Sequence, residues 1–332
     1  MPHLSTTEGI LSAVGGTPLV RLSRLFPDSP ARFHAKLEGL NPGGSGKDRA
    51  ATGMVVGAME IGRLVPGKST VIESSSGNLG IGLAQVCRLY GIRFVCVVDP
   101  KTTAQNISIL RAYGAEVDVV TTPDNAQGDF LSARIRRVRE LLHDIPHSFW
   151  PDQYANELNA KAQTRVMQEI TEQLDGSVDH LLVATGSCGT INGCVQYITE
   201  HGLATRVVAV DAEGSAIFGQ PGCSRLVPGH GAAIRPGLHY DGIAHSVMRM
   251  TDQDCVVGCR RLAGVEAILA GGSSGALVSA AARLADELPD GANCVLVLPD
   301  RGERYLDTIY SDAWVEAHFG DIRYLWKEQA EC

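Results

Sequence analysis

One stretch organises the whole chain: Asn41-Pro42-Gly43-Gly44-Ser45-Gly46-Lys47-Asp48-Arg49. It is a Gly-rich turn with a single lysine, Lys47, and it leads directly into residues 48–64, whose apolar spacing predicts a helix. Lys47 is therefore expected at a helix N-terminus, where the helix dipole and any burial disfavour the ammonium form. A neutral lysine amine is a nucleophile, and its natural partner is an aldehyde. The alternative is an ordinary surface lysine in a glycine turn.

Length and composition predict a soluble protein of two domains. The chain has 332 residues, which is more than one hydrophobic core usually covers, and 44% of them are apolar. The formal net charge is -8 without a basic tract, which argues against a nucleic-acid partner. We recognise neither the pattern of a secretory signal nor an apolar run of membrane-spanning length. We therefore expect a cytoplasmic protein that acts on small molecules.

The cysteine and histidine patterns point to neither disulfides nor a metal. The chain has nine cysteines, an odd number, and most lie inside apolar runs, unlike a disulfide framework. Cys255 and Cys259 are one helical turn apart, but no second pair at zinc spacing accompanies them, so no metal site is expected. His230 lies in a Gly-rich loop and is read as an ordinary polar loop residue, with a place near a site as the alternative.

A serine-rich loop forms the second unusual segment. Ser74-Ser75-Ser76-Gly77-Asn78-Leu79-Gly80 joins an expected strand, residues 70–73, to an expected helix, residues 81–90. A strand–loop–helix junction directs backbone N–H groups toward an anion. The alternative is a helix cap, but a cap needs only one of the three serines. The excess of hydroxyl groups favours a ligand site.

The order of elements in the first half predicts a parallel sheet. Expected strands at residues 70–73, 92–98 and 116–120 alternate with expected helices, so the sheet should have helices on both faces. The helix expected over residues 130–142 carries four arginines, which we read mostly as a solvated face. One of them could instead point inward toward a carboxylate substrate. The four are Arg134, Arg136, Arg137 and Arg139.

Two further loops of small residues occur in the second half. Thr185-Gly186-Ser187-Cys188-Gly189-Thr190 follows an expected strand, residues 180–184, and opens a helix. It lacks the spacings of dinucleotide and P-loop sites, so it suits a single phosphate. Residues 271–276 precede a helix expected over residues 277–288, and residues 219–242 should form a long loop over a cleft. Three such loops at strand ends, with one nucleophilic lysine, suit pyridoxal phosphate.

The motifs resemble those of the fold-type II pyridoxal-phosphate enzymes, specifically the cysteine synthase and cystathionine β-synthase family. The similarity spans roughly residues 8–310. Its motifs occur in this order: G-G-T-P-L at 15–19, N-P-x-x-S-x-K-D-R at 41–49, S-G-N-x-G at 76–80, G-[ST]-x-G-T at 186–190 and G-x-S-S-G-A at 271–276.

The resemblance implies a tryptophan synthase β-like α/β fold of two three-layer α/β/α domains with mostly parallel sheets. With a change of domain near Pro151, residues 1–40 and 151–315 would form the larger, cofactor-binding domain. Residues 41–150 would form a smaller, mobile, substrate-binding domain, and residues 316–332 a tail that packs on a partner subunit. A homodimer is the oligomer that the resemblance implies.

The resemblance also implies roles for individual residues. Lys47 would carry the cofactor as a Schiff base, and Asn78 would bind the cofactor 3′-oxygen. Ser273 would face the pyridine nitrogen, where a neutral group in place of a carboxylate favours β-elimination. The residues that would hold the cofactor phosphate are Gly186, Ser187, Cys188, Gly189 and Thr190. Those that would receive the substrate α-carboxylate are Ser75, Ser76, Gly77 and Gln153.

Three departures from a standard cysteine synthase point to a particular branch. Leu79 stands where threonine is usual, Asp152-Gln153-Tyr154 replaces N-Q-F, and Cys188 replaces glycine. The changes resemble the N-(2-amino-2-carboxyethyl)-L-glutamate synthases. Those transferases join O-phospho-L-serine to L-glutamate and release phosphate, on the way to 2,3-diaminopropionate for siderophores and antibiotics.

Glutamate carries two carboxylates and needs a polar site, whereas sulfide does not. By the same resemblance, Arg134, Tyr154 and Ser187 would recognise glutamate, although Arg136 or Arg137 could serve in place of Arg134. Three alternatives stay open: a cysteine or cystathionine synthase, a serine or threonine dehydratase, and an amino-acid sensor that keeps the fold without catalysis.

Overall fold

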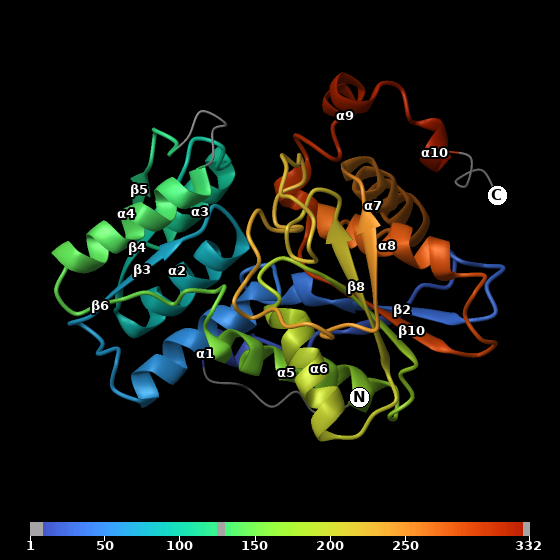
Figure 1. The fold of residues 1–332 in the computed structure, drawn as a ribbon, viewed down its shortest axis with the longest axis horizontal. Coiled ribbons are helices and arrows are strands. Elements are labelled where there is room, and N and C mark those ends of the chain that lie inside the picture. The colour runs from blue at the N-terminus through green and yellow to red at the C-terminus, as the bar shows by residue number, and fades with distance from the viewer. Residues whose placement is uncertain (1–8, 125–129, 328–332) are drawn as a thin grey trace. The chain divides into compact units, whose positions relative to one another are not determined.

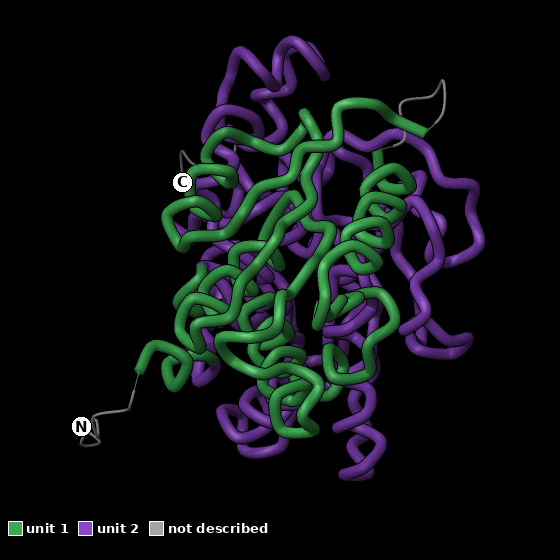
Figure 2. The backbone as a smooth tube through the Cα atoms, turned by 90° about the vertical axis from the view of Figure 1, so that its left-hand side faces the viewer, with its two compact units in different colours: residues 1–14, 41–43, 47–162 green, residues 15–40, 44–46, 163–332 purple. Residues whose placement is uncertain are grey.

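The computed structural model describes residues 9–124 and 130–327, so Cys332 and the end of the expected tail lie outside the described residues. The chain divides into two compact units (Figure 2). Unit 1 comprises residues 1–14, 41–43 and 47–162, and unit 2 comprises residues 15–40, 44–46 and 163–332. The last change of unit along the chain falls between Ala162 and Gln163, inside helix α5 (Glu157–Gln173).

Unit 1 is built on a four-stranded sheet with the order β5-β4-β3-β6 (Figure 1). All of its strand pairs are parallel, as the alternation of strands and helices predicts. The strands are β3 (Thr70–Ser74), β4 (Arg93–Val98), β5 (Glu116–Val119) and β6 (Ser148–Phe149). The helices are α1 (Lys47–Glu60), α2 (Asn78–Tyr90), α3 (Ala104–Ala112) and α4 (Phe130–Asp144).

Alternation along the strands of unit 1 explains its layers. Val71 and Phe94 belong to a core shared with α1 and α2, whereas Ile72 and Val95 belong to a second core shared with α4. Successive side chains of a strand point to opposite faces, so a strand that is apolar on both faces must be covered on both. The prediction of a parallel sheet with helices on both faces is confirmed.

Unit 2 contains a six-stranded sheet with the order β1-β2-β10-β7-β8-β9. β1 pairs antiparallel to β2, and all other neighbours are parallel. The strands are β1 (Leu19–Arg21), β2 (Arg32–Leu37), β7 (His180–Ala184), β8 (Arg206–Ala212), β9 (Ser246–Met250) and β10 (Asn293–Leu298). The main helices besides α5 are α6 (Gly189–Glu200), α7 (Asp252–Glu266) and α8 (Gly272–Leu284), and two short ones end the unit, α9 (Asp312–Phe319) and α10 (Tyr324–Lys327).

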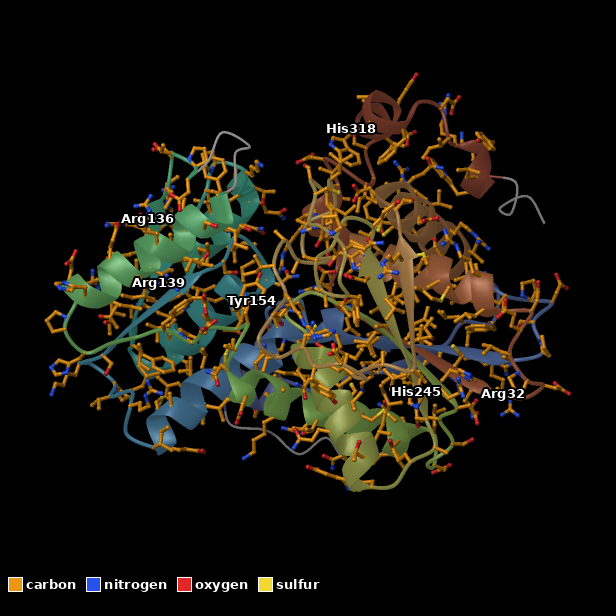
Figure 3. The ribbon with its side chains drawn as sticks, viewed as in Figure 1. Arg32, Arg136, Arg139, Tyr154, His245 and His318 are labelled. Atoms are coloured by element: carbon orange, nitrogen blue, oxygen red, sulfur yellow. The ribbon has the colours of Figure 1, made fainter. Side chains whose placement is uncertain are left out.

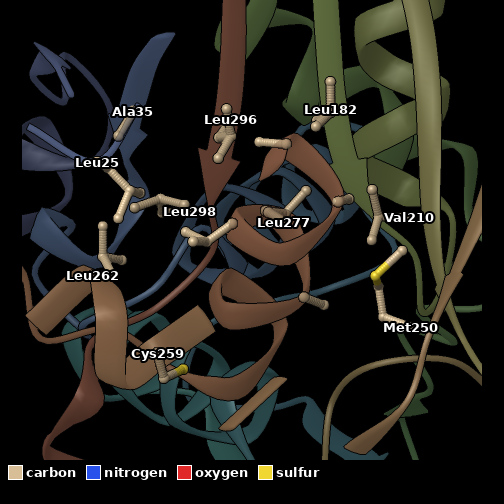
Figure 4. Close-up of a cluster of buried hydrophobic side chains, with 14 of the residues drawn as sticks. Leu25, Ala35, Leu182, Val210, Met250, Cys259, Leu262, Leu277, Leu296 and Leu298 are labelled. Atoms are coloured by element: carbon tan, nitrogen blue, oxygen red, sulfur yellow. The ribbon is translucent and has the colours of Figure 1, made fainter. Parts of the chain in front are cut away.

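The sheet of unit 2 also has a core on each face. Leu182, Leu296 and Leu298 pack with α7 and α8, and Figure 4 shows Leu277 of α8 among them. Their neighbours in sequence, such as Leu181 and Val297, pack with α5 and α6 instead. No helix within residues 9–124 and 130–327 is long and apolar enough to cross a membrane.

Two expectations about unit 2 need correction. The segment Gly271–Ala276 is not a loop at the end of a strand, because α8 begins at Gly272 and Gly271 is its N-cap. The small residues of this segment allow the first turn of α8 to pack closely on α7: a Cβ on Gly275 would lie 1.9 Å from the Cys255 carbonyl oxygen. Strand β9 was not expected from the sequence either. The long irregular segment expected at residues 219–242 is confirmed, and it connects β8 to β9.

Candidate active site

Lys47 directly follows residues 44–46, which belong to unit 2 and are hydrogen-bonded within it. The Gly46 N–H donates to the Pro299 carbonyl over 2.9 Å, and the Gln163 amide donates to the Gly46 carbonyl over 3.0 Å. The backbones of Ser45 and Asp300 form an isolated antiparallel β-bridge, and Asp300 lies two residues after the end of β10. Lys47 is the next residue, and it is the first residue of α1 in unit 1, as the sequence predicts.

The glycine before this segment is required by a close contact within unit 1. The Gly43 N–H donates to the Asp48 carboxylate, and a Cβ on Gly43 would lie 2.4 Å from Oδ1 of Asp48. Only glycine lets the backbone approach this carboxylate so closely. The contact closes the turn before α1 and defines where the helix begins.

The serine-rich loop leads from β3 into α2. The Ser75 Oγ accepts the Gly80 N–H over 2.9 Å, so this serine partly serves the capping role that was the alternative. The Asn106 amide donates to the Ser76 carbonyl over 2.9 Å. Asn78 is the first residue of α2, whose N-cap residue, Gly77, has no capping side chain within the described residues. The backbone of the loop is therefore held in place, with Asn78 at the start of α2.

The turn after β6 is held by its own asparagines. The Asn156 amide donates to the Pro151 carbonyl over 2.7 Å, and the Asn159 amide donates to the Gln153 carbonyl over 2.8 Å. Gln153 is buried, and Tyr154 is half-buried in unit 1 (Figure 3). The loop 75–78 and this turn thus carry the residues to which the resemblance assigns the substrate α-carboxylate.

The structure separates the four arginines of α4. Arg136 pairs with Asp124 and Glu140, and Arg137 pairs with Asp118 and Glu140. Arg136 and Arg139 are exposed on the helix (Figure 3).

Arg134 differs from its neighbours because its side chain is only 13% exposed. Its Nε lies 3.3 Å from Oδ2 of Asp99, at the carboxyl end of β4. Its Nη1 makes no hydrogen bond to any described residue. Asp99 was missed at the sequence level, although it directly follows the apolar run 92–98. An aspartate at the end of a buried strand is a usable signal.

In unit 2, the loop Gly186–Thr190 leads into the N-terminus of α6. Cys188 is the N-cap residue and has a φ of 63°, in the left-handed region that glycine adopts without strain. The Cys188 side chain does not cap this helix end, whereas the Ser187 Oγ accepts the Gly189 N–H over 3.4 Å. Backbone N–H groups at a helix N-terminus suit an anion. Burial raises the pKa of the Cys188 thiol to about 12, which keeps it protonated and unreactive at neutral pH.

Contacts behind the loop hold it against the sheet. The Thr185 Oγ1 donates to Asp211 over 2.8 Å, and the Gly231 N–H donates to the Thr185 carbonyl over 2.8 Å. Asp211 was also missed, although it lies near the end of the buried strand β8. The irregular segment between β8 and β9 therefore supports the loop Gly186–Thr190 through Gly231.

The second serine motif of unit 2 lies in the first turn of α8. Ser273 is buried at 8% exposure, and Ser274 is fully buried. The Ser274 Oγ has no hydrogen-bond partner among the described residues. The helix start thus offers hydroxyl groups and backbone N–H groups, with no carboxylate in its first turn.

Comparison with known proteins identifies the family. A family model described as "Pyridoxal-phosphate dependent enzyme" matches residues 10–300. The chain belongs to this family. Its cofactor is therefore pyridoxal phosphate.

Solved structures place this pyridoxal-phosphate enzyme near the cysteine synthases. O-ureido-L-serine synthase is 32% identical, with a TM-score of 0.86, over 94% of this chain and 99% of that one. O-acetylserine dependent cystathionine beta-synthase from Helicobacter pylori is 31% identical, with a TM-score of 0.85, over 93% and 100%. Cysteine synthase from Entamoeba histolytica is 31% identical, with a TM-score of 0.86, over 93% and 92%.

The residues present fit this cofactor. The backbone N–H groups at the N-terminus of α6 provide donors for a phosphate dianion. The buried hydroxyl groups of α8 suit a neutral pyridine nitrogen, because they can donate a hydrogen bond without the charge of a carboxylate. Lys47 is the lysine of the segment 41–49. The pyridoxal-phosphate enzyme thus has suitable groups in each unit.

Proposed function

We propose that the protein is a transferase that joins O-phospho-L-serine to L-glutamate. The products are N-(2-amino-2-carboxyethyl)-L-glutamate and phosphate, a step toward L-2,3-diaminopropionate for a siderophore or peptide product. The observation that carries the proposal is Arg134, a largely buried guanidinium with Nη1 unbonded among the described residues. A cation in that setting suits a carboxylate partner, whereas sulfide requires none.

Four groups of residues would hold the cofactor. Lys47 would bind its aldehyde, Gly186–Thr190 its phosphate, Asn78 its 3′-oxygen and Ser273 its pyridine nitrogen. The bound pyridoxal ring withdraws electrons from Cα of the amino acid, which permits loss of the β-substituent. The amine of Lys47 would take the Cα proton and return it to the product.

Two groups of residues would bind the amino acids. The α-carboxylate of phosphoserine would be received by Ser75, Ser76, Gly77 and Gln153. Arg134, Tyr154 and Ser187 would bind glutamate, with the Arg134 guanidinium oriented by Asp99. Its direct pair with Asp99 means that Arg134 presents one remaining edge to a carboxylate, so binding should be selective for a ligand that fits that edge.

A second candidate is a cysteine synthase or a cystathionine β-synthase. The favouring observation is the similarity to solved structures with those names, at 31% identity over 93% of this chain. These reactions share the first half with the proposed one and differ in the nucleophile. A homodimer is part of either proposal and is checked by light scattering of the purified protein.

The experiment compares nucleophiles under one set of conditions. The purified enzyme is incubated with O-phosphoserine or O-acetylserine, and with glutamate, sulfide or homocysteine, and products are identified by mass spectrometry. We expect the glutamate adduct with phosphate release from O-phosphoserine. Lys47→Ala should abolish turnover. Product formation from sulfide or homocysteine alone would overturn the proposal in favour of the second candidate.

A variant pair on one helix tests the role of Arg134. Arg134→Met should raise KM for glutamate at least about tenfold, the effect of losing a charge-assisted hydrogen bond. Arg137→Met is the matched control, because that guanidinium pairs with Asp118 and Glu140 on the surface of α4. Equal effects of the two variants would remove the case for Arg134.

A further inference from the structure

Glu73 is a buried carboxyl with no role in the chemistry described above. It lies in β3, two residues before the loop 75–78, and is only 2% exposed. Its Oε1 accepts the Ser74 N–H over 2.8 Å and the indole N–H of Trp150 over 3.0 Å. Its Oε2 has no hydrogen-bond partner within the described residues.

These hydrogen bonds join two segments where the strand pairing ends. β3 and β6 pair only at Thr70 with Ser148 and at Val71 with Phe149. Beyond that register, β3 continues into the loop 75–78, and β6 continues through Trp150 into the turn 152–154. The bond from Trp150 to Glu73 is a side-chain link between the two segments past the end of the ladder. Both segments belong to unit 1.

The groups around Glu73 shift the pKa of its carboxyl in both directions. Burial raises the pKa of the Glu73 carboxyl to about 7, and the charge of Asp152 acts in the same direction. The hydrogen bonds from Trp150 and Ser74 and the backbone of Gln153 act in the opposite direction. On β4, the charge of Glu73 raises the pKa of the buried Cys96 thiol, and the charge of Arg134 lowers it. Proton loss from Glu73 near neutral pH would therefore place a second negative charge beside Asp152.

We propose that Glu73 is a positioning residue that sets the spacing between the loop 75–78 and Gln153. The inference rests on the proposed function, which assigns the substrate α-carboxylate to these two segments. Glu73 acts through Ser74 and Trp150 and does not contact the substrate. Its loss therefore weakens binding of the first amino acid, while the cofactor-binding groups Lys47 and Gly186–Thr190 are unaffected.

The test uses three variants of the intact enzyme. Trp150→Phe removes the indole donor, and Glu73→Gln keeps the shape but cannot ionise. Ser148→Ala is the matched control on β6, because its hydroxyl donates to the Leu142 carbonyl over 3.1 Å and has no bond to Glu73. The readouts are KM and kcat for the β-substituted serine from pH 6 to 8, the visible absorbance of the bound cofactor and the melting temperature.

We expect Trp150→Phe to raise KM about tenfold, roughly the effect of one hydrogen bond, with kcat changed less than about threefold. Its cofactor absorbance should match the wild type, and Ser148→Ala should change neither constant. Glu73→Gln should flatten the dependence of KM on pH near neutrality. An unchanged KM in Trp150→Phe, or a loss of cofactor that accompanies the rise in KM, overturns the proposal.

The test of Glu73 can succeed or fail independently of the proposed function. The α-carboxylate is common to O-phosphoserine and O-acetylserine, so KM is measured with whichever of the two is turned over. If the enzyme uses O-acetylserine and sulfide, the proposed function fails, and a tenfold rise in KM still supports Glu73 as a positioning residue. If neither serine derivative changes the cofactor absorbance, both proposals fail.

Discussion

The ammonium group of Lys36 lies 2.8 Å from the Glu169 carboxylate inside unit 2, and the Lys36 side chain is fully buried. Lys36 also donates to the Thr17 carbonyl over 2.6 Å, and Glu169 accepts the Gly16 N–H over 3.0 Å. The pair thus connects the motif at residues 15–19 with β2 and α5. A buried charge that loses its partner is costly, whereas an apolar pair of similar volume can be tolerated.

The first prediction concerns this pair. Glu169→Leu should lower the free energy of unfolding by about 3–5 kcal/mol, because it leaves the Lys36 ammonium buried without its counterion. Lys36→Met should lower the free energy of unfolding by less, since Glu169 is partly exposed and keeps its hydrogen bond from the Gly16 N–H. The double variant should recover part of the loss. Urea denaturation measures all three, and strictly additive losses would contradict the pairing.

The second prediction concerns the contact between α7 and α8. Gly275→Ala should destabilise the protein by about 1–3 kcal/mol or more, because its Cβ would overlap the Cys255 backbone. Gly264→Ala is the control in α7, where a Cβ would meet nothing within 4 Å. It should stabilise by about 0.5–1 kcal/mol through helix propensity. Melting temperatures distinguish the two, and a shift of the same sign would refute the packing argument.

The third prediction concerns the left-handed backbone of Cys188. Cys188→Gly should be more stable than Cys188→Ala by about 1 kcal/mol, since alanine keeps the strain at φ 63° and glycine relieves it. Both variants lose the buried thiol, so their difference isolates the backbone term. Chemical denaturation of the pair gives the difference directly. Greater stability of the alanine variant would mean that the residue is unstrained.

The fourth prediction concerns pH. Burial lowers the pKa of His230 from 6.5 to about 4, and the charge of Arg225 adds to this, while the Asp211 backbone opposes it. The stability that the neutral imidazole contributes is therefore complete above pH 6.5 and is lost as the pH falls toward 4. Between pH 7 and pH 5 this amounts to about 2 kcal/mol.

His230→Leu should remove that loss. Neither ring nitrogen makes a hydrogen bond to a described residue, so an apolar side chain of similar size sacrifices little. Unfolding free energies of both proteins at pH 5, 6 and 7 provide the measurement. Parallel curves for the wild type and the variant would show that His230 does not titrate as described.

Much of the fold could be predicted from local patterns. The parallel sheet of unit 1 followed from apolar runs alternating with helical periodicity. The start of α1 at Lys47 was also expected. These features depend on residues close together in sequence, whose preferences are readable without a partner. Strand β9 escaped prediction because it is an edge strand of mostly half-buried residues and lacks a clear apolar run.

The sequence by itself determined the chemistry available: the lysine in its glycine turn, the serine loops, the uncharged residues at Gly186–Thr190 and the cofactor class that their motifs imply. Only the tertiary structure decided which polar groups meet. It directed Arg134 to Asp99 and Arg137 to the surface, and it buried Glu73 against Trp150, 77 residues away. It also made Gly275 a packing contact. The reason is physical: burial and pairing depend on atoms brought together from distant parts of the chain, which no local pattern encodes.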